Sequence, residues 1–67
     1  MKNKVRELRK RHELNQHELA ELIGISRQAI NAIEKEKFDP SLPTAFKLSE
    51  LFKISIEELF IFKSLYY

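Results

Sequence analysis

The chain has no cysteine, a single glycine and no long apolar run. Without cysteine it can form neither a disulfide nor a thiolate zinc site. One glycine is too few for a glycine-rich phosphate-binding loop. No segment approaches the roughly 20 apolar residues of a membrane-spanning helix, and the charged N-terminus lacks the apolar centre of a signal peptide. We therefore expect a cytoplasmic protein.

The composition predicts one small globular domain that covers residues 1–67. Hydrophobic residues make up 43% and charged residues 33% of the chain, which excludes a disordered class. A domain of this size buries only about 60% of the surface that its unfolded chain exposes, so it needs well-formed helices or a partner subunit. The net charge is only +2, although residues 1–13 carry six basic and two acidic side chains, and this balance does not by itself indicate nucleic acid.

Apolar spacing and capping residues predict an all-α fold of five short helices. The expected helices cover residues 3–12, 16–23 and 27–36, a segment opening at 41 or 42, and a last one from 56 to about 60. Asn15, Ser26 and Ser55 are the N-caps that mark three of the starts. The segment 61–67 has a β-leaning composition, which also favours a short C-terminal strand.

The segment 16–35 has the pattern of a helix-turn-helix. Ala20 is small at the point where two helices would cross closely, and Gly24 tolerates the positive φ of the turn. A generic helical hairpin would need the same buried aliphatic residues, but not alanine and glycine at these offsets. The pattern predicts a unit whose second helix lies in the major groove of DNA. Its expected buried positions are Leu19, Ile23, Ile25, Ile30 and Ile33.

Two runs span nearly the whole chain and match a known family: LRKRHELNQHELAELIGISRQAINAIEKEKFDPSL and KLSELFKISIEELF. In these runs the chain resembles the phage repressor and Cro-like regulators of the Xre type. The resemblance implies a compact, five-helix lambda-repressor-like domain that binds DNA. Two positions depart from the family pattern. Lys53 stands where glycine is usual, and Leu22 stands where a polar residue is usual, so Leu22 is expected to be an exposed apolar residue.

The resemblance implies that the exposed side of the third helix reads bases through Arg27, Gln28 and Asn31. The chemistry of these side chains fits that role. Arginine can bond guanine O6 and N7, and glutamine or asparagine can bond adenine N6 and N7. In the alternative interpretation, Arg27 and Gln28 are ordinary surface residues of a first helical turn.

The same resemblance implies contacts to the DNA backbone. Gln16 opens the second helix, whose N-terminal amides can also hold a phosphate. Lys35 and Lys37 flank the end of the third helix, and Arg11 belongs to the basic N-terminal segment that can reach phosphates. Phe38, in the loop that follows, is expected in the core.

The resemblance further implies an ion pair between Arg9 and Glu34. Such a pair would tie the first helix to the end of the third and hold the reading helix in place. If the pair is partly buried, removing one partner would cost several kcal/mol.

A metal or enzyme interpretation fails on spacing. His12 and His17 lie beside Glu13 and Glu18, but the two histidines are five residues apart across an expected helix break. Zinc-binding histidines on one helix need a spacing of four. We therefore expect no catalytic residues, no metal, no cofactor and no small-molecule ligand.

The C-terminal tail, residues 61–67, is rich in large apolar and aromatic side chains. A small monomer cannot cover all of them, so we expect a homodimer built on the fifth helix and the tail. In one alternative, Phe60 and Ile61 close the core of a monomer while the rest frays. In another, the tail pairs as a strand with the N-terminal residues. The expected interface residues are Phe60, Phe62, Leu65 and Tyr66.

These patterns together predict a dimeric, sequence-specific repressor that binds an inverted-repeat operator in double-stranded DNA. The alternative is a protein-interaction module or antitoxin that has the same fold and no DNA contact. Glu18 and Glu21 favour that alternative, because they would repel phosphate if they faced it.

Overall fold

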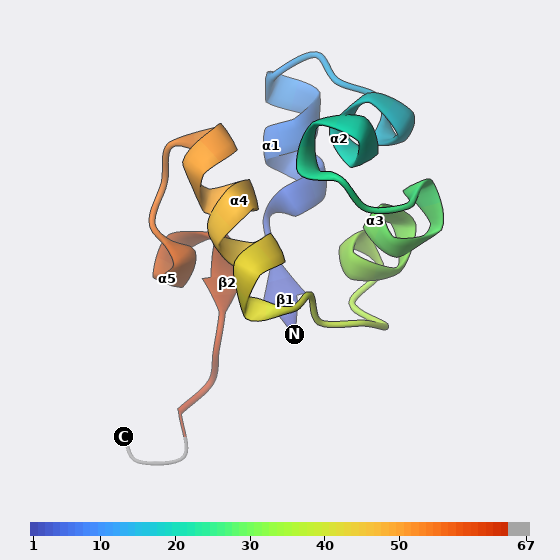
Figure 1. The fold of residues 1–67 in the computed structure, drawn as a ribbon. Coiled ribbons are helices and arrows are strands. Elements are labelled where there is room, and N and C mark those ends of the chain that lie inside the picture. The colour runs from blue at the N-terminus through green and yellow to red at the C-terminus, as the bar shows by residue number, and fades with distance from the viewer. Residues whose placement is uncertain (65–67) are drawn as a thin grey trace.

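The computed structural model describes residues 1–64, which form five helices and two short strands (Figure 1). None of these helices is long and apolar enough to span a membrane. The strands pair antiparallel, with Lys2 opposite Ile61 and Asn3 opposite Phe60. The expected five-helix fold with a short C-terminal strand is confirmed. The elements are β1 (Lys2–Asn3), α1 (Val5–Arg11), α2 (Gln16–Ile23), α3 (Arg27–Glu34), α4 (Leu42–Phe52), α5 (Ile56–Leu59) and β2 (Phe60–Ile61).

Capping residues determine where four of the helices begin. The Asn15 side chain accepts a hydrogen bond from the N–H of Glu18, and the Glu18 carboxylate accepts one from the N–H of Asn15. Ser55 forms the same reciprocal box at α5. Each cap satisfies an N–H group that the helix itself leaves unpaired, so α2 to α5 begin where the sequence predicts. The single side-chain caps of α3 and α4 are Ser26 and Ser41.

The first helix begins at Val5, two residues later than predicted, because Lys2 and Asn3 belong to β1. The Asn3 Oδ1 atom accepts a bond from the Val5 N–H at 3.1 Å, and its Nδ2 donates to the Ile33 carbonyl at 2.9 Å. Asn3 therefore connects the start of α1 with the end of α3. The prediction of a helix from residue 3 was wrong because the partners that hold Asn3, β2 and the Ile33 carbonyl, lie far away in sequence and leave no local signal.

The third helix ends at Glu34 and not at residue 36. Glu36 has a φ of 62°, which turns the chain away from the helix axis. The prediction that Phe38 lies in the core was also wrong, since its side chain is 51% exposed. Ile33 and its neighbours already close the core at this end, and the loop carrying Phe38 runs over the surface.

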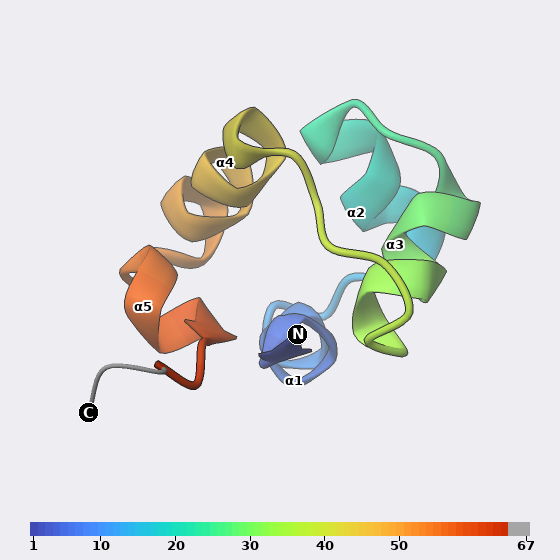
Figure 2. The ribbon, with the colours of Figure 1, turned by 90° about the horizontal axis from the view of Figure 1, so that it is seen from below.

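The core lies around α1, which sits between the α2–α3 pair and the α4–α5 pair (Figure 2). Of the predicted helix-turn-helix positions, Ile25 is only half-buried, and the other four are buried. Leu22 is 61% exposed, as its departure from the family pattern predicts. The buried apolar side chains among residues 1–64 are Val5, Leu8, Leu19, Ala20, Ile23, Ile30, Ile33, Ala45, Leu48, Phe52, Leu59 and Phe60.

The end of α4 offers a test of backbone strain. Lys53 terminates this helix in the left-handed conformation with a φ of 57°, which glycine adopts without a steric cost. We expect Lys53→Gly to raise the free energy of unfolding by about 0.5–1 kcal/mol, measured by urea denaturation. Lys53→Ala removes the same side chain but keeps the Cβ, so it should bring no gain. An equal gain in both variants would contradict this explanation.

Candidate nucleic-acid interface

The two central helices pack as a helix-turn-helix. Ala20 is 3% exposed at their contact, and its carbonyl accepts bonds from the N–H groups of Gly24 and Ile25 at 2.8 and 3.1 Å. Gly24 has a φ of 86°, while a Cβ there would meet nothing within 4 Å. Glycine is therefore favoured by the backbone conformation and not by lack of space. The turn leaves α3 at the edge of the molecule, with one flank open (Figures 1 and 2).

The open flank of α3 carries the residues that the sequence predicts as base readers. Arg27 and Gln28 are exposed in the first turn, and Asn31 is half-buried one turn later. Ile30 and Ile33, on the opposite flank, are fully buried. The structure thus brings the three predicted readers to one side of a helix whose other side is held by the core.

Arg9 and Glu34 meet in a bidentate ion pair. The Arg9 Nε and Nη2 atoms lie 2.7 and 3.2 Å from the Glu34 carboxylate oxygens Oε2 and Oε1. The two side chains are only 10% and 4% exposed. A third guanidinium nitrogen, Nη1, donates to the Leu14 carbonyl at 2.9 Å. Arg9 therefore connects α1, the loop before α2, and the last residue of α3.

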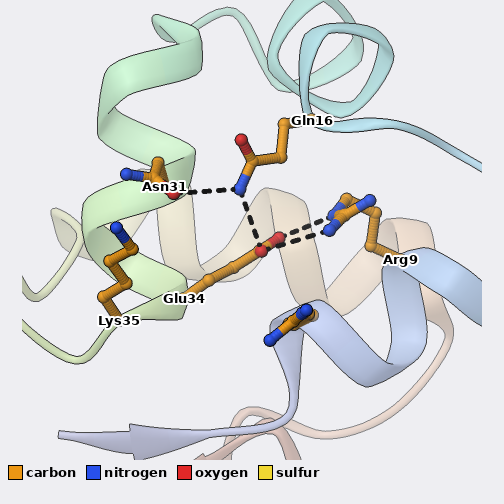
Figure 3. Close-up of a pocket in the computed structure, with 6 residues that line it drawn as sticks. Arg9, Gln16, Asn31, Glu34 and Lys35 are labelled. Atoms are coloured by element: carbon orange, nitrogen blue, oxygen red, sulfur yellow. Dashed lines mark hydrogen bonds and ion pairs between the residues drawn. The ribbon is translucent and has the colours of Figure 1, made fainter.

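Gln16 extends this pair to the reading flank (Figure 3). Its Nε2 atom lies 3.1 Å from Glu34 Oε1 and 3.2 Å from Asn31 Oδ1. Arg9, Glu34, Gln16 and Asn31 thus form one continuous network from three helices. The sequence predicts Gln16 and Asn31 as separate DNA contacts and does not reveal the bond between them. No local signal marks it, because the two residues lie on different helices.

A shallow cavity of about 200 Å³ lies between these helices and is lined by the network together with Arg6 and Lys35. Glu34, the acidic residue of the lining, is already paired with Arg9. The cations Arg6 and Lys35 are exposed, so the opening of the cavity suits an anion. Arg6 belongs to the basic N-terminal segment that the sequence predicts can reach phosphates.

The other predicted backbone contacts are exposed but lie outside this cavity. Lys37 is in the loop after α3, where its N–H bonds the Ala32 carbonyl at 3.0 Å. Arg11 ends α1 and pairs with Glu7 on the same helix at 3.2 Å. The Arg11 side chain can turn toward a nearby phosphate at little cost, because exposed ion pairs are weak.

The acidic residues of α2 have local partners. The Glu18 carboxylate belongs to the capping box, and Glu21 lies 2.6 Å from His17 Nε2. His12 bonds the Leu8 carbonyl of its own helix through Nδ1 at 2.9 Å. Within residues 1–64, the acidic and histidine side chains form no group that could hold a metal ion.

The predicted dimer residues divide into three groups. Phe60 is 7% exposed and belongs to the core of the protomer, whereas Phe62 is 71% exposed. Leu65 and Tyr66 lie outside the described residues. An apolar depression of about 260 Å³ lies beside Phe60, and Pro40 and Leu42 also line it.

Comparison with known proteins agrees with this geometry. A family model described as helix-turn-helix matches residues 5–59. The chain belongs to this helix-turn-helix family. An uncharacterized HTH-type transcriptional regulator of Methanocaldococcus jannaschii is 51% identical over 63 residues, which cover 94% of this chain and 96% of that protein. The transcriptional repressor RstR of the cryptic phage CTXphi in Vibrio cholerae is 39% identical over 85% of this chain and 51% of its own length.

A solved structure places the fold in the same family. The restriction-modification controller protein C.AhdI from Aeromonas hydrophila superposes with a TM-score of 0.75 at 35% identity, over 85% of this chain and 86% of that one. The lambda-repressor-like architecture that the sequence predicts is thus confirmed. These likenesses also identify the helix-turn-helix protein as a regulator and not an enzyme.

Removing one partner of the buried ion pair should be far more costly than removing one partner of an exposed pair. We expect Arg9→Met to lower the free energy of unfolding by about 3–5 kcal/mol, because it leaves the Glu34 carboxylate buried without its cation. Denaturant unfolding measures the loss. Arg11→Met breaks an exposed pair and should cost no more than about 0.5 kcal/mol. The double variant Arg9→Met/Glu34→Leu should lose less than Arg9→Met. Equal losses for Arg9→Met and Arg11→Met would contradict this ranking.

Proposed function

We propose that this helix-turn-helix protein is a sequence-specific regulator of transcription that binds double-stranded DNA as a dimeric repressor. The observation that supports the proposal is the open flank of α3, with Arg27, Gln28 and Asn31 on one side and a fully buried opposite side. A helix with three hydrogen-bonding side chains along its open flank suits the major groove. A transcriptional regulator of similar length that is 51% identical to this chain further supports the proposal.

The readers divide by chemistry and position. Arg27 and Gln28 lie in the first turn of α3, next to the cap Ser26, where they can reach deepest into the groove. Arginine offers paired donors that match guanine O6 and N7, and glutamine offers a donor and an acceptor. Asn31 follows one turn later and would read a neighbouring base pair.

Phosphate contacts would fix the register of α3 in the groove. Lys35 and Arg6 flank the cavity between α1 and α3, and Lys37 follows in the loop. The N-terminus of α2 adds the main-chain N–H of Gln16, at the positive end of the helix dipole. Arg11 is the remaining candidate from the basic N-terminal segment.

A dimer bound to an operator can repress transcription simply by occupying the DNA. One helix-turn-helix reads about half a site, so two copies on an inverted repeat double the contacts. Phe62, exposed beyond β2, leads into the tail that contains Leu65 and Tyr66, and we propose these residues as the dimer surface. The phage repressor RstR and the restriction-modification controller protein C.AhdI, both similar to this chain, support a role in regulation.

One observation favours a second function. Leu22 is 61% exposed on α2, and it lines a shallow depression with Leu14, Glu18 and Glu21. An apolar residue surrounded by acidic ones suits a basic protein partner. An interaction module or antitoxin would bind its partner through this surface, and its α3 would not bind DNA.

Selection of binding sites from a random duplex library tests the base readers. At about 150 mM salt we expect an enriched inverted repeat, with Arg27→Ala, Gln28→Ala and Asn31→Ala each relaxing the preference at a different base pair by about 1–3 kcal/mol. Weak binding without enrichment, unaffected by these variants, would contradict sequence reading and favour the interaction module.

The salt dependence of binding tests the phosphate contacts. Lys35→Ala should weaken binding to all sequences and reduce the slope of log affinity against log salt by about one. Lys53→Ala is the matched control, since this lysine is also exposed, at the end of α4, and its removal should leave the slope unchanged. Equal slopes for the two variants would remove Lys35 from the interface.

Sedimentation analysis of the full chain tests the dimer surface. Phe62→Ser should raise the dimer dissociation constant at least about tenfold, because two buried phenyl groups are lost per dimer. Leu22→Ser is the control, since Leu22 is 61% exposed on α2, which lies across the core from β2 (Figures 1 and 2). A dimer that tolerates Phe62→Ser, and that survives truncation after Phe60, would exclude the tail as its interface.

A further inference from the structure

The side-chain amide of Asn31 can face DNA in two ways. With its oxygen outward it accepts a hydrogen bond, and with its NH2 outward it donates one. We propose that the Arg9–Glu34 ion pair, acting through Gln16, holds this amide with the NH2 toward the groove, so that Asn31 reads guanine and not adenine. The proposal rests on the proposed function, in which the open flank of α3 enters the major groove.

The orientation begins at Glu34. Its carboxylate is held by Arg9 at 2.7 and 3.2 Å and is 4% exposed. An ionised carboxylate accepts hydrogen bonds and donates none. The Gln16 atom that lies 3.1 Å from Glu34 Oε1 must therefore be the amide nitrogen, since an oxygen there would face another oxygen without a hydrogen between them.

The fixed orientation of the Gln16 amide in turn determines the orientation of the Asn31 amide. The same Nε2 atom lies 3.2 Å from Asn31, so the Asn31 atom that faces it must be the acceptor Oδ1. The NH2 group of Asn31 then points away from Gln16, as Figure 3 shows. Both hydrogens of Gln16 Nε2 are engaged, so its side chain has no donor left for a phosphate. In this arrangement Gln16 is a positioning residue for Asn31, and its main-chain N–H remains for the DNA backbone.

Reversing the Asn31 amide has a clear cost. Its NH2 would then face the NH2 of Gln16, and the Gln16 amide cannot turn in response because Glu34 accepts only from nitrogen. Asn31 and Gln16 are both half-buried, which limits the compensation that water can offer for a lost bond. The network therefore selects one of the two orientations before DNA arrives.

The major-groove edges of the bases respond differently to an outward NH2 group. Guanine presents two acceptors, N7 and O6, and both can accept from the two hydrogens of Asn31 Nδ2. Adenine presents the N7 acceptor beside the N6 donor, which repels a second donor. Thymine offers a single acceptor at O4, and cytosine offers a donor. Guanine is thus preferred, and adenine loses the paired bonds that a freely turning asparagine would form with it.

Binding-site selection with two variants tests this polarity. Asn31→Ala locates the base pair that Asn31 reads, as the pair whose preference relaxes. At that pair we expect the unaltered protein to prefer guanine over adenine by about five- to a hundredfold. Gln16→Met keeps the length of the side chain but removes the donor, so Asn31 turns freely and adenine should become as good as guanine. His17→Met, at the exposed neighbouring position, is the control and should retain the guanine preference.

The outcomes separate this proposal from the proposed function. Two outcomes would overturn the proposed orientation of the Asn31 amide but leave base reading by Asn31 intact. In the first, the unaltered protein prefers adenine at the located base pair. In the second, Gln16→Met retains the guanine preference. If Asn31→Ala relaxes the preference at no base pair, both proposals fail at this residue.

Hydrogen exchange by NMR on the free protein provides a test without DNA. The side-chain NH2 of Gln16 should exchange with water several-fold more slowly than that of Asn31, and the reverse order would overturn the proposal.

Discussion

The structure depends on one buried carboxylate, that of Glu34. It accepts hydrogen bonds from Arg9 of α1 and from Gln16 of α2, although it belongs to α3 itself. A charge that is 4% exposed is tolerated only when its partners are in place, so the three helices must come together in one arrangement. The hydrophobic core supplies most of the driving force, but it is non-directional. The carboxylate specifies how α3 is oriented over that core.

The sequence predicted the elements best where the signal is local. Asn15, Ser26 and Ser55 bond to N–H groups three residues away, and Gly24 ends α2 through its own backbone freedom. Such interactions are contained within one turn and can be read from spacing alone. The predicted helix from residue 3 failed for the opposite reason. Asn3 is held by β2 and by the carbonyl of Ile33, which are distant in sequence, and no local pattern reveals such partners.

The same distinction applies to the candidate site. The family resemblance was enough to place Arg27, Gln28 and Asn31 on the exposed side of the third helix and to pair Arg9 with Glu34. The bond from Gln16 to Asn31 could not be predicted, because it depends on how closely α2 and α3 cross. Phe38 was misplaced because hydrophobicity alone does not say that other side chains have already filled the core.

The two-stranded sheet has a consequence for communication along the chain. Asn3 pairs with Phe60 of β2 through its main chain and with the Ile33 carbonyl through its side chain. One residue therefore separates the C-terminal strand from the last turn of α3. By thermodynamic linkage, an interaction that stabilises the strand pair also stabilises the contact between Asn3 and the last turn of α3. An interaction that stabilises this contact stabilises the strand pair by the same free energy. Association through the tail and the rigidity of the reading helix would then be coupled equilibria in a chain of 67 residues.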